Sequence, residues 1–236
     1  MFCISVKDLT KRYGNVIALY NVTFNIECNE KWALLGPNGA GKSTMLKILA
    51  GLIKPDKGEV RIMDKDPSSP EVRKILGYLP EDADPFPGLS VIDNLKFVAS
   101  LRDVDESKIY DLLDLLDLRQ YMNYKASTLS RGNRQKLAIA MAILHNPSLL
   151  LLDEPLNYLD IPSQETVIDL FSRLNSTLLV STHILSVADR LATKVLIISN
   201  GTIRWIGDFS LLRSMGKEDE PIERIVARII KEGKVF

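Results

Sequence analysis

The order of apolar and polar residues predicts short strands toward both ends of the chain and a block of helices between them. Alternating apolar positions predict strands at residues 2–9 and 16–26, joined by a turn at 11–15. Continuous apolar runs are typical of strands buried inside a sheet. These buried strands are expected at 32–35, 75–80, 149–152 and 177–181, and further strands at 59–63, 194–199 and 202–206.

Helical spacing begins where a polar, proline-rich linker at 81–88 ends, and it continues to about residue 146. Ser90 is positioned to cap the first helix, with Asp93 at the spacing of a capping box. A helical block between strands predicts an inserted subdomain at about 89–146. An apolar stripe in this block is expected to face the core, and its members are Ile109, Leu112, Leu113, Leu115 and Leu116.

Shorter helical segments accompany the strands and the end of the chain. They are expected at 45–52, after the loop at 66–70, at about 163–173 and shortly after residue 183. The tail, about 208–236, contains an acidic cluster at 218–220 and a basic amphipathic helix at 222–231. We interpret this last helix as a solvated closing helix. A single domain of 236 residues accommodates all of these elements.

A glycine-rich turn joins the strand at 32–35 to the helix at 45–52, and it fits the phosphate-binding P-loop pattern G-x-x-x-x-G-K-[ST]. Such a turn directs backbone N–H groups and the positive end of the helix dipole at an anion. We expect Lys42 to reach the β- and γ-phosphates of a nucleoside triphosphate, and the Ser43 hydroxyl to bind Mg²⁺. The expected nucleotide-binding residues are Gly36, Pro37, Asn38, Gly39, Ala40, Gly41, Lys42, Ser43 and Thr44.

Tyr13 lies in the turn predicted at 11–15, shortly before the P-loop. An exposed tyrosine can stack on a base, since every base offers a π-face. The alternative is a hairpin tyrosine that packs on its own strands. Next to a P-loop, we favour the stacking interpretation.

Acidic residues and a histidine follow two of the predicted buried strands. Asp153 and Glu154 come directly after 149–152, at the strand end where α/β folds bind ligands. Beside a P-loop, Asp153 is expected to help hold Mg²⁺, and Glu154 to polarise the water that attacks the γ-phosphate. His183 follows the strand at 177–181 and is placed to sense that phosphate. His145 precedes Asn146 in a helix-to-loop turn and is interpreted as structural.

A second glycine turn precedes the helix predicted after residue 136. Ser130 and Gly132 at this helix start form a further anion-binding N-terminus. One γ-phosphate hardly needs two anion-binding helix N-termini from the same subunit. We therefore expect the turn at 129–133 to complete the site of a neighbouring subunit.

Composition narrows the class of protein. Thirty basic and thirty acidic residues cancel, which argues against a surface built to hold nucleic acid. The longest aliphatic runs are too short to cross a bilayer, and the N-terminus does not resemble a signal peptide. Cys3 and Cys28 lack metal-ligand spacing and are interpreted as reduced thiols in a cytosolic protein.

Taken together, these motifs resemble those of an ATP-binding-cassette (ABC) ATPase, the nucleotide-binding subunit of an ABC transporter, over nearly the whole chain. The P-loop, the turn at 129–133, the carboxylates at 153–154 and His183 occur in the order typical of that family. The resemblance marks Tyr13 as the base-stacking aromatic and Asp160 as the aspartate of a loop that crosses the dimer interface. It also identifies Leu129, Ser130, Arg131, Gly132 and Asn133 as the signature turn.

The family resemblance implies an α/β fold of the P-loop NTPase class. Such a fold has a RecA-like core with a parallel sheet, an N-terminal antiparallel β subdomain and the inserted helical subdomain. It also implies a head-to-tail homodimer or heterodimer that sandwiches two ATP molecules with Mg²⁺. Separate transmembrane permease subunits would dock on the helical block, which puts the chain in the cytoplasm at the inner face of the membrane.

Two positions depart from the family pattern. Glu81 stands where glutamine is usual, and it adds a negative charge near Asp153 and Glu154. The resemblance nevertheless implies that Glu81 lies at the metal and reports to the permease. In the signature turn, Arg131 and Asn133 replace the usual glycine and glutamine, as in ATPase subunits of drug and antibiotic exporters.

The leading hypothesis is therefore an ATPase that powers transport, with export favoured, and Lys42, Glu154 and His183 as its catalytic residues. One alternative is a soluble ABC ATPase acting in DNA repair or translation. Another is a non-hydrolysing regulatory subunit that senses ATP. The cargo, the choice between homodimer and heterodimer and the selectivity for ATP over GTP stay open at this stage.

Overall fold

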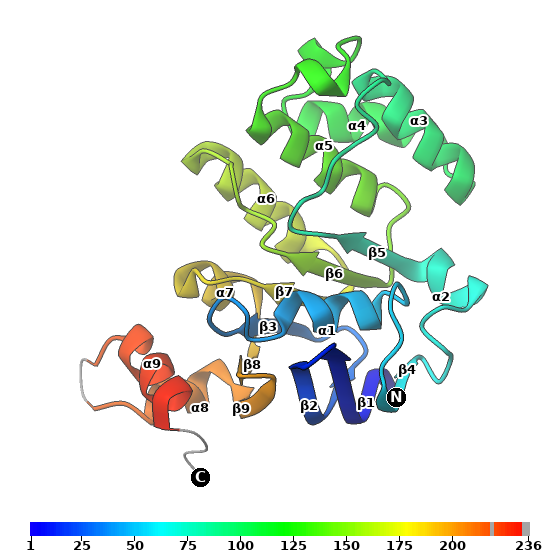
Figure 1. Ribbon diagram of the computed structural model, residues 1–236. Coiled ribbons are helices and arrows are strands. Elements are labelled where there is room, and N and C mark those ends of the chain that lie inside the picture. The colour runs from blue at the N-terminus through cyan, green and yellow to red at the C-terminus, as the bar shows by residue number, and fades with distance from the viewer. Residues whose placement is uncertain (218–219, 233–236) are drawn as a thin grey trace.

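The computed structural model describes residues 1–217 and 220–232, in which two sheets pack with helices around them (Figure 1). The strands follow, in chain order. They are β1 (Phe2–Tyr13), β2 (Val16–Glu27), β3 (Lys31–Leu35), β4 (Lys57–Ile62), β5 (Leu76–Leu79), β6 (Leu149–Asp153), β7 (Thr177–Ser181), β8 (Lys194–Ser199) and β9 (Thr202–Asp208).

One sheet is antiparallel and the other is mostly parallel. Within the described residues, the antiparallel sheet has three strands in the order β2-β1-β4. The larger sheet has six strands in the order β5-β6-β7-β3-β8-β9, and its β9 alone runs antiparallel to its neighbour. The predicted combination of a parallel core and an N-terminal antiparallel sheet is confirmed.

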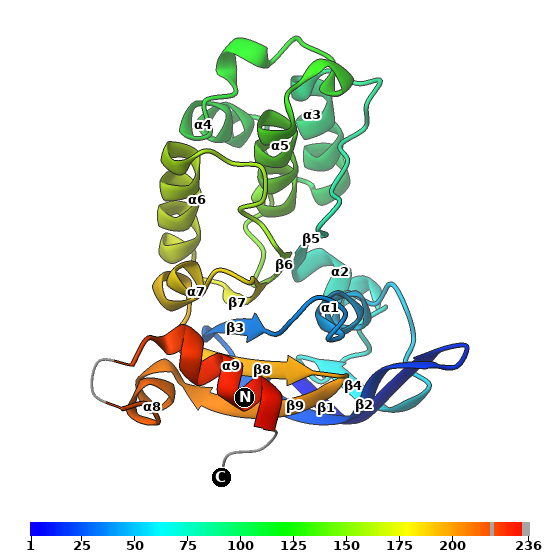
Figure 2. The same cartoon turned by 60° about the vertical axis from the view of Figure 1, so that its left-hand side comes forward.

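The helices follow the predicted order. They are α1 (Lys42–Leu49), α2 (Pro70–Ile75), α3 (Val91–Arg102), α4 (Ser107–Leu115), α5 (Arg131–Ile143), α6 (Ile161–Arg173), α7 (Leu185–Leu191), α8 (Phe209–Ser214) and α9 (Ile222–Glu232), with short 3₁₀ turns at Arg119–Tyr121 and Ala126–Thr128. Two of them begin earlier than predicted, α1 at Lys42 and α5 at Arg131, so that part of each glycine turn belongs to the first turn of its helix. Helix α1 packs between the two sheets, whereas α3, α4 and α5 form a helical layer beyond the β5 edge (Figure 2). Ser90 caps α3 as predicted, because its Oγ accepts a hydrogen bond from the Asp93 N–H at 3.1 Å.

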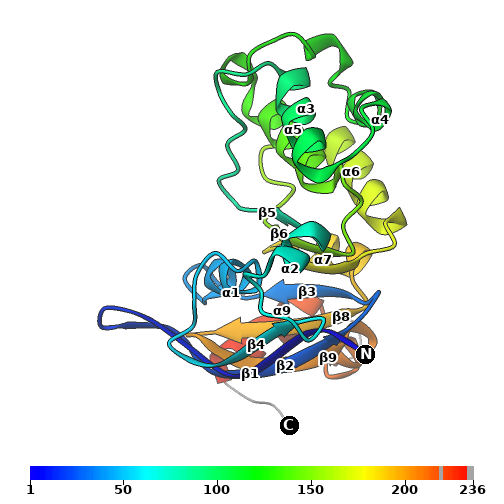
Figure 3. The ribbon, with the colours of Figure 1, turned by 90° about the vertical axis from the view of Figure 1, so that its right-hand side faces the viewer.

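The N-terminal hairpin is longer than predicted. Strands β1 and β2 pair as far as Tyr13 and Val16, so that the turn shrinks to Gly14 and Asn15. Gly14 adopts a φ of 57°, which suits a two-residue hairpin turn. The polar residues at 11–13 suggested a loop, but their backbone groups belong to the ladder. The hairpin projects from the rest of the molecule (Figure 3).

Two expectations about apolar faces are wrong in part. Leu115 is 46% exposed, although Ile109, Leu113 and Leu116 are buried. Six residues after Ile109, Leu115 points about 240° around the helix, away from the core. Helix α9 is solvated on one side only, because Ile225, Val226 and Ile229 are buried against β8 and β9. Of the acidic cluster, residues 218 and 219 lie outside the described residues.

The central strands bring separate parts of the chain to one edge of the larger sheet. β3, β6 and β7 are almost wholly buried, and they run parallel, so that their carboxyl ends meet. The P-loop follows β3, Glu154 follows β6, and His183 lies two residues beyond β7. The register sets Asp153 opposite Ser181. Sequence-distant side chains are thereby assembled into one site.

Candidate functional site

The P-loop passes from β3 into α1 through a turn that requires glycine at Gly41. Gly41 has a φ of 107°, and a Cβ there would lie 2.5 Å from the backbone oxygen of Ala18. Lys42, the first residue of α1, is 7% exposed. Its ammonium donates hydrogen bonds to the backbone oxygens of Gly36 at 2.8 Å and Pro37 at 3.3 Å. The lysine therefore folds back over the loop, and its third N–H can serve a ligand.

Two buried carboxylates stand at the end of β6. Asp153 is 1% exposed, and the Ser181 hydroxyl donates a hydrogen bond to its Oδ1. The Glu154 backbone N–H donates to the Ser181 backbone oxygen at 3.1 Å, which anchors this turn to β7. Glu154 itself has a φ of 48°, a strained conformation for a residue with a side chain. Strain of this kind is typical of functional sites, where the surrounding structure enforces it.

His183 contacts the second of these carboxylates. Its Nδ1 lies 2.9 Å from Oε2 of Glu154, and the histidine side chain is 61% exposed, whereas that of Glu154 is 9% exposed. The pair therefore has a buried member and a solvent-facing member. Such an arrangement can orient a carboxylate and present an imidazole N–H to a ligand at the cleft.

Glu81 completes a cluster of negative charge. Partial burial, and then the neighbouring charges of Asp153, Asp82 and Glu154, raise the pKa of the Glu81 carboxyl. Burial and the charge of Asp153 likewise raise the pKa of Tyr78 to about 12. Electrostatic repulsion among these carboxylates favours a cation between them.

These groups line one cleft of about 300 Å³, which we call the P-loop cleft. It brings together most of the side chains singled out from the sequence. Its lining consists of Tyr13, Val16, Ile17, Ala18, Asn38, Gly39, Ala40, Gly41, Lys42, Ser43, Thr44, Glu81, Asp153 and Glu154. Tyr13, the last residue of β1, is 49% exposed and overlooks the P-loop from the hairpin. His183 stands beside the cleft through its contact with Glu154.

The signature turn, residues 129–133, is not part of this lining. Ser130 caps α5, and its Oγ accepts a hydrogen bond from the Asn133 N–H at 3.2 Å. Asp160 likewise caps α6 and accepts from the Ser163 N–H at 3.0 Å. Hydrogen bonds from the Ser163 hydroxyl and backbone hold the pKa of Asp160 below its usual value. The structure thus presents the start of α5 as a second anion-binding helix start, separate from the start of α1 in the P-loop cleft.

Comparison with known proteins identifies the family. A family profile described as ABC transporter matches residues 19–157, which are more than half of the chain. The matched stretch contains the P-loop, the signature turn and both carboxylates. The chain belongs to the ABC transporter family.

Relatives of this chain include ATP-binding proteins that are named for different cargoes. The lantibiotic transport ATP-binding protein SrtF of Streptococcus pyogenes is 37% identical over 203 residues, which are 85% of this chain and 88% of SrtF. The molybdate/tungstate import ATP-binding protein WtpC of Methanocaldococcus jannaschii is 34% identical over 216 residues, which are 89% of this chain and 72% of WtpC.

A solved structure extends the comparison to the reaction. The dimeric post-hydrolysis state of the ATP-binding cassette MJ0796 bound to ADP and Pi matches with a TM-score of 0.80 at 28% identity. The match covers 87% of this chain and 98% of that cassette. Family and fold together make the present chain an ATP-binding, ATP-hydrolysing subunit of the ABC transporter family. In the part of the chain that the structure describes, no helix combines the length and apolar character needed to span a bilayer.

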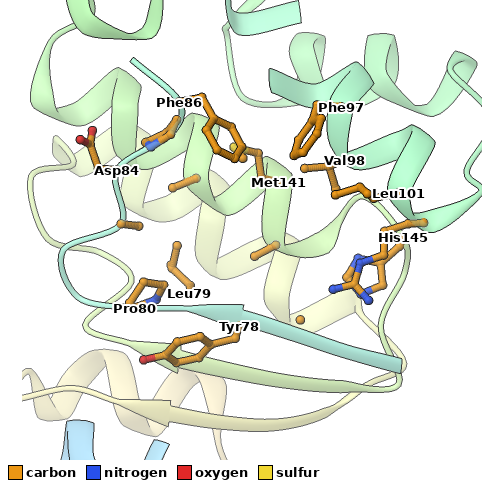
Figure 4. Close-up of a pocket in the computed structure, with 16 residues that line it drawn as sticks. Tyr78, Leu79, Pro80, Asp84, Phe86, Phe97, Val98, Leu101, Met141 and His145 are labelled. Carbon is orange, nitrogen blue, oxygen red and sulfur yellow. The ribbon is translucent and has the colours of Figure 1, made fainter. Parts of the chain in front are cut away.

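A second cavity of this ABC ATPase lies between β5 and helices α3 and α5, and we call it the β5–α3 groove (Figure 4). It measures about 350 Å³ and is mostly apolar. Phe86 and Phe97 meet edge to face on its rim, with ring centroids 5.1 Å apart. His145 lies at the other end, where its Nε2 donates to the Leu76 backbone oxygen at 3.0 Å. His145 is thus a groove residue, remote from the P-loop cleft.

Sequence reasoning missed four residues that build or support these sites. Ser181 appeared only as the end of a strand, whereas it binds Asp153. Val16 and Ile17 line the P-loop cleft beside Tyr13. Gln135, buried in α5, donates to the Pro155 backbone oxygen at 2.9 Å. A polar residue in an otherwise apolar strand or helix face is the signal that points to Ser181 and Gln135.

Proposed function

We propose that this ATPase powers a transporter whose permease is a separate membrane chain, and that two such subunits close around two ATP molecules. The observation that carries the proposal is the separation of the two anion-binding helix starts. The P-loop, Glu81, Asp153 and Glu154 share one cleft, whereas the signature turn at 129–133 lies outside it. A second subunit is needed to bring a signature turn over each P-loop.

ATP would enter the P-loop cleft with its base on Tyr13 and its phosphates on the P-loop. The tyrosine ring is exposed on the hairpin, and the apolar side chains of Val16 and Ile17 stand next to it. The backbone N–H groups of residues 38–44 and the N-terminus of α1 would hold the phosphates. Lys42 would contribute its remaining N–H to the β/γ region.

Ser43, Asp153 and Glu81 fit the role of Mg²⁺ ligands. All three are hard oxygen donors that line the P-loop cleft. Burial first, and then the neighbouring carboxylates, raise the pKa of Glu81, and a cation would offset the second of these effects. In residues 1–217 and 220–232, no group of three or more His, Cys, Asp or Glu side chains is arranged to hold a metal by itself. The ion would therefore enter with the nucleotide, whose phosphates complete its coordination. When bound, it neutralises charge on the phosphates.

Hydrolysis would rest on Glu154. This carboxylate is buried at the end of the cleft, where it can accept a proton from the attacking water. His183 would hold Glu154 through Nδ1 and turn its second ring nitrogen toward the γ-phosphate. The hydrogen bond from Ser181 would hold Asp153 in place beside the phosphates. These roles need no residue from outside the subunit except the partner's signature turn.

The partner subunit would supply Ser130 and Gly132 to the γ-phosphate, and Asp160 would lie at the interface between the two subunits. Both turns begin helices whose first N–H groups are available for an anion or a neighbouring chain. Homodimer and heterodimer satisfy this geometry equally.

The β5–α3 groove is the surface on which we propose that the permease docks. Gly77, Leu79 and Pro80 line the groove, and the next residue, Glu81, lines the P-loop cleft. A segment pressed into the groove would therefore act directly on a residue at the nucleotide. This arrangement holds the ATPase at the inner face of the membrane. We favour export as the direction because of the departures in the signature turn.

The decisive experiment is size-exclusion chromatography of Glu154→Gln with ATP and Mg²⁺. We expect a dimer that contains two nucleotides, and a monomer when Ser130→Arg is added. Nucleotide binding to the Ser130→Arg variant should persist, since the P-loop cleft is intact. A Glu154→Gln protein that stays monomeric at saturating ATP contradicts the proposed closure.

A further inference from the structure

Residues 155–160, which follow Glu154, are held against the start of α5 within the same subunit. At one end, Gln135 donates its buried hydrogen bond to the Pro155 backbone oxygen. At the other, a Cβ on Gly132 would lie 2.9 Å from the Tyr158 backbone oxygen. The guanidinium of Arg131 lies over the Tyr158 ring, 5.5 Å from its centroid. The signature turn and the segment after Glu154 therefore form one connected unit.

The backbone of this segment is strained at both ends. Glu154 has a φ of 48° and Tyr158 a φ of 68°, and both are left-handed conformations that side chains disfavour. Such conformations persist only where surrounding contacts hold them. The Gln135 hydrogen bond secures the Pro155 end. At the other end, Arg131 stacks on the Tyr158 ring, and the Gln164 side chain donates to the Leu159 backbone oxygen at 3.0 Å.

Arg131 is an unfavourable residue for the helix that it begins. It is the first residue of α5, where the positive end of the helix dipole repels a cation. Helix stability therefore does not account for an arginine here. Its guanidinium instead lies over an aromatic ring that is itself 54% exposed, an arrangement in which a cation and a π-face attract.

We propose that Arg131 and Tyr158 form a latch that sets the conformation of residues 155–160 and, through them, the position of Glu154. The latch makes the hydrolytic carboxylate of a subunit responsive to the state of its own signature turn. In the proposed dimer that turn contacts the partner's nucleotide, so that the latch would link the nucleotide in one site to the position of Glu154 in the other. The proposal rests on the proposed function, in which Glu154 polarises the attacking water. Arg131 and Tyr158 act here as positioning residues.

The latch acts on the alignment of Glu154 and leaves the P-loop contacts unchanged. Loss of either partner should therefore lower kcat and leave KM for ATP unchanged. We expect a decrease of about fivefold in kcat, which corresponds to about 1 kcal/mol. The double variant should be no slower than either single variant, since the two residues act as one unit.

The test is a double-mutant cycle on kcat and KM with Arg131→Ala, Tyr158→Ala and the combination of both. Tyr158→Phe should retain wild-type kcat because the ring remains, and Arg131→Lys should retain part of it because the cation remains. A matched control is the pair Arg119 and Tyr110, which stack at 5.0 Å elsewhere in the helical layer. Tyr110→Ala should leave both kinetic constants unchanged.

Each possible result bears on the latch. Additive losses in the double variant overturn it, and so does a raised KM. If Arg131→Ala lowers kcat and Tyr158→Ala does not, the arginine acts on the partner's phosphate instead, and the latch is also overturned. Thermal unfolding of each variant checks the fold. If Tyr158→Ala does not fold, Tyr158→Leu completes the same cycle. If the wild-type protein does not hydrolyse ATP, the proposed function itself is refuted. Failure of the latch and failure of the proposed function therefore give different results.

Discussion

Nδ1 of His183 and Oε2 of Glu154 lie 2.9 Å apart, and the two residues come from the ends of neighbouring parallel strands. The histidine side chain faces solvent, and the glutamate side chain faces the cleft. This contact fixes the orientation of the carboxylate that is proposed to accept a proton from water. Its removal should disturb the chemical step more than nucleotide binding.

His183→Ala should therefore lower kcat by about 10²-fold, the lower end of the range for assistance to a general base. The affinity for ATP should stay close to that of the wild type, because the P-loop contacts are unchanged. Steady-state ATPase assays and fluorescent-nucleotide titration measure the two quantities. His145→Gln is the control, since His145 lies in the β5–α3 groove. Equal losses in both variants would exclude a specific role for His183.

Tyr13→Ala should weaken ATP binding with little effect on kcat. Base–aromatic stacking contributes about 1–3 kcal/mol, so KM should rise about 5- to 160-fold. Tyr13→Phe should bind like the wild type because the ring is retained. Tyr20 is a matched control, since it is 57% exposed on β2 and does not line the P-loop cleft. A Tyr20→Ala variant with the same defect would contradict stacking at Tyr13.

Stability at acidic pH should depend on His145. Burial and the charge of Arg102 lower the pKa of His145 from 6.5 to about 4. In the unfolded chain the imidazole takes up a proton at about pH 6.5, whereas in the folded chain it resists protonation until about pH 4. The stabilising contribution of the neutral imidazole is thus complete above pH 6.5 and is lost as the pH falls from 6.5 to about 4.

Urea unfolding at pH 7.5, 6 and 5 measures this dependence. The wild type should lose about 1–2 kcal/mol more than His145→Gln between pH 7.5 and pH 5, after allowance for partial exposure. If His145→Gln shows the wild-type slope, another group controls the acid sensitivity.

Phe97→Ala should uncouple the ATPase from its permease. The ring lies 44% exposed on the rim of the β5–α3 groove, in contact with Phe86. Truncation of an aromatic anchor typically costs at least about 1–2 kcal/mol of binding free energy. We expect affinity for the permease to fall about tenfold while basal hydrolysis is unchanged. Leu115→Ala, at an exposed position outside the groove, is the control. Co-purification with the permease and stimulated ATPase activity provide the measurements.

Features formed by residues that are adjacent in the chain were predictable, because their structure depends only on nearby residues. The P-loop is a strand, a glycine turn and a helix within one short stretch, and Ser90 caps α3 three residues before its partner. Asp153, Glu154 and His183 were predictable because each follows an apolar run that is recognisable as a strand. The family pattern then gave these residues their roles. Leu115 shows the limit of this reasoning. It belongs to the predicted apolar stripe, but it is exposed, and the sequence pattern does not reveal which leucine lies outside the buried helix face.

The sequence by itself determined the nucleotide-binding motif and the type of most elements, because backbone geometry and hydrophobic period are local. Only the tertiary structure decided which residues meet. The strand order sets Ser181 beside Asp153, and the chain after β5 carries Glu81 from the groove to the cleft. The approach of α5 to residues 155–160 brings Arg131 onto Tyr158. These contacts join residues that lie far apart in the chain. They form because whole helices and strands pack together, and no local sequence pattern encodes that packing.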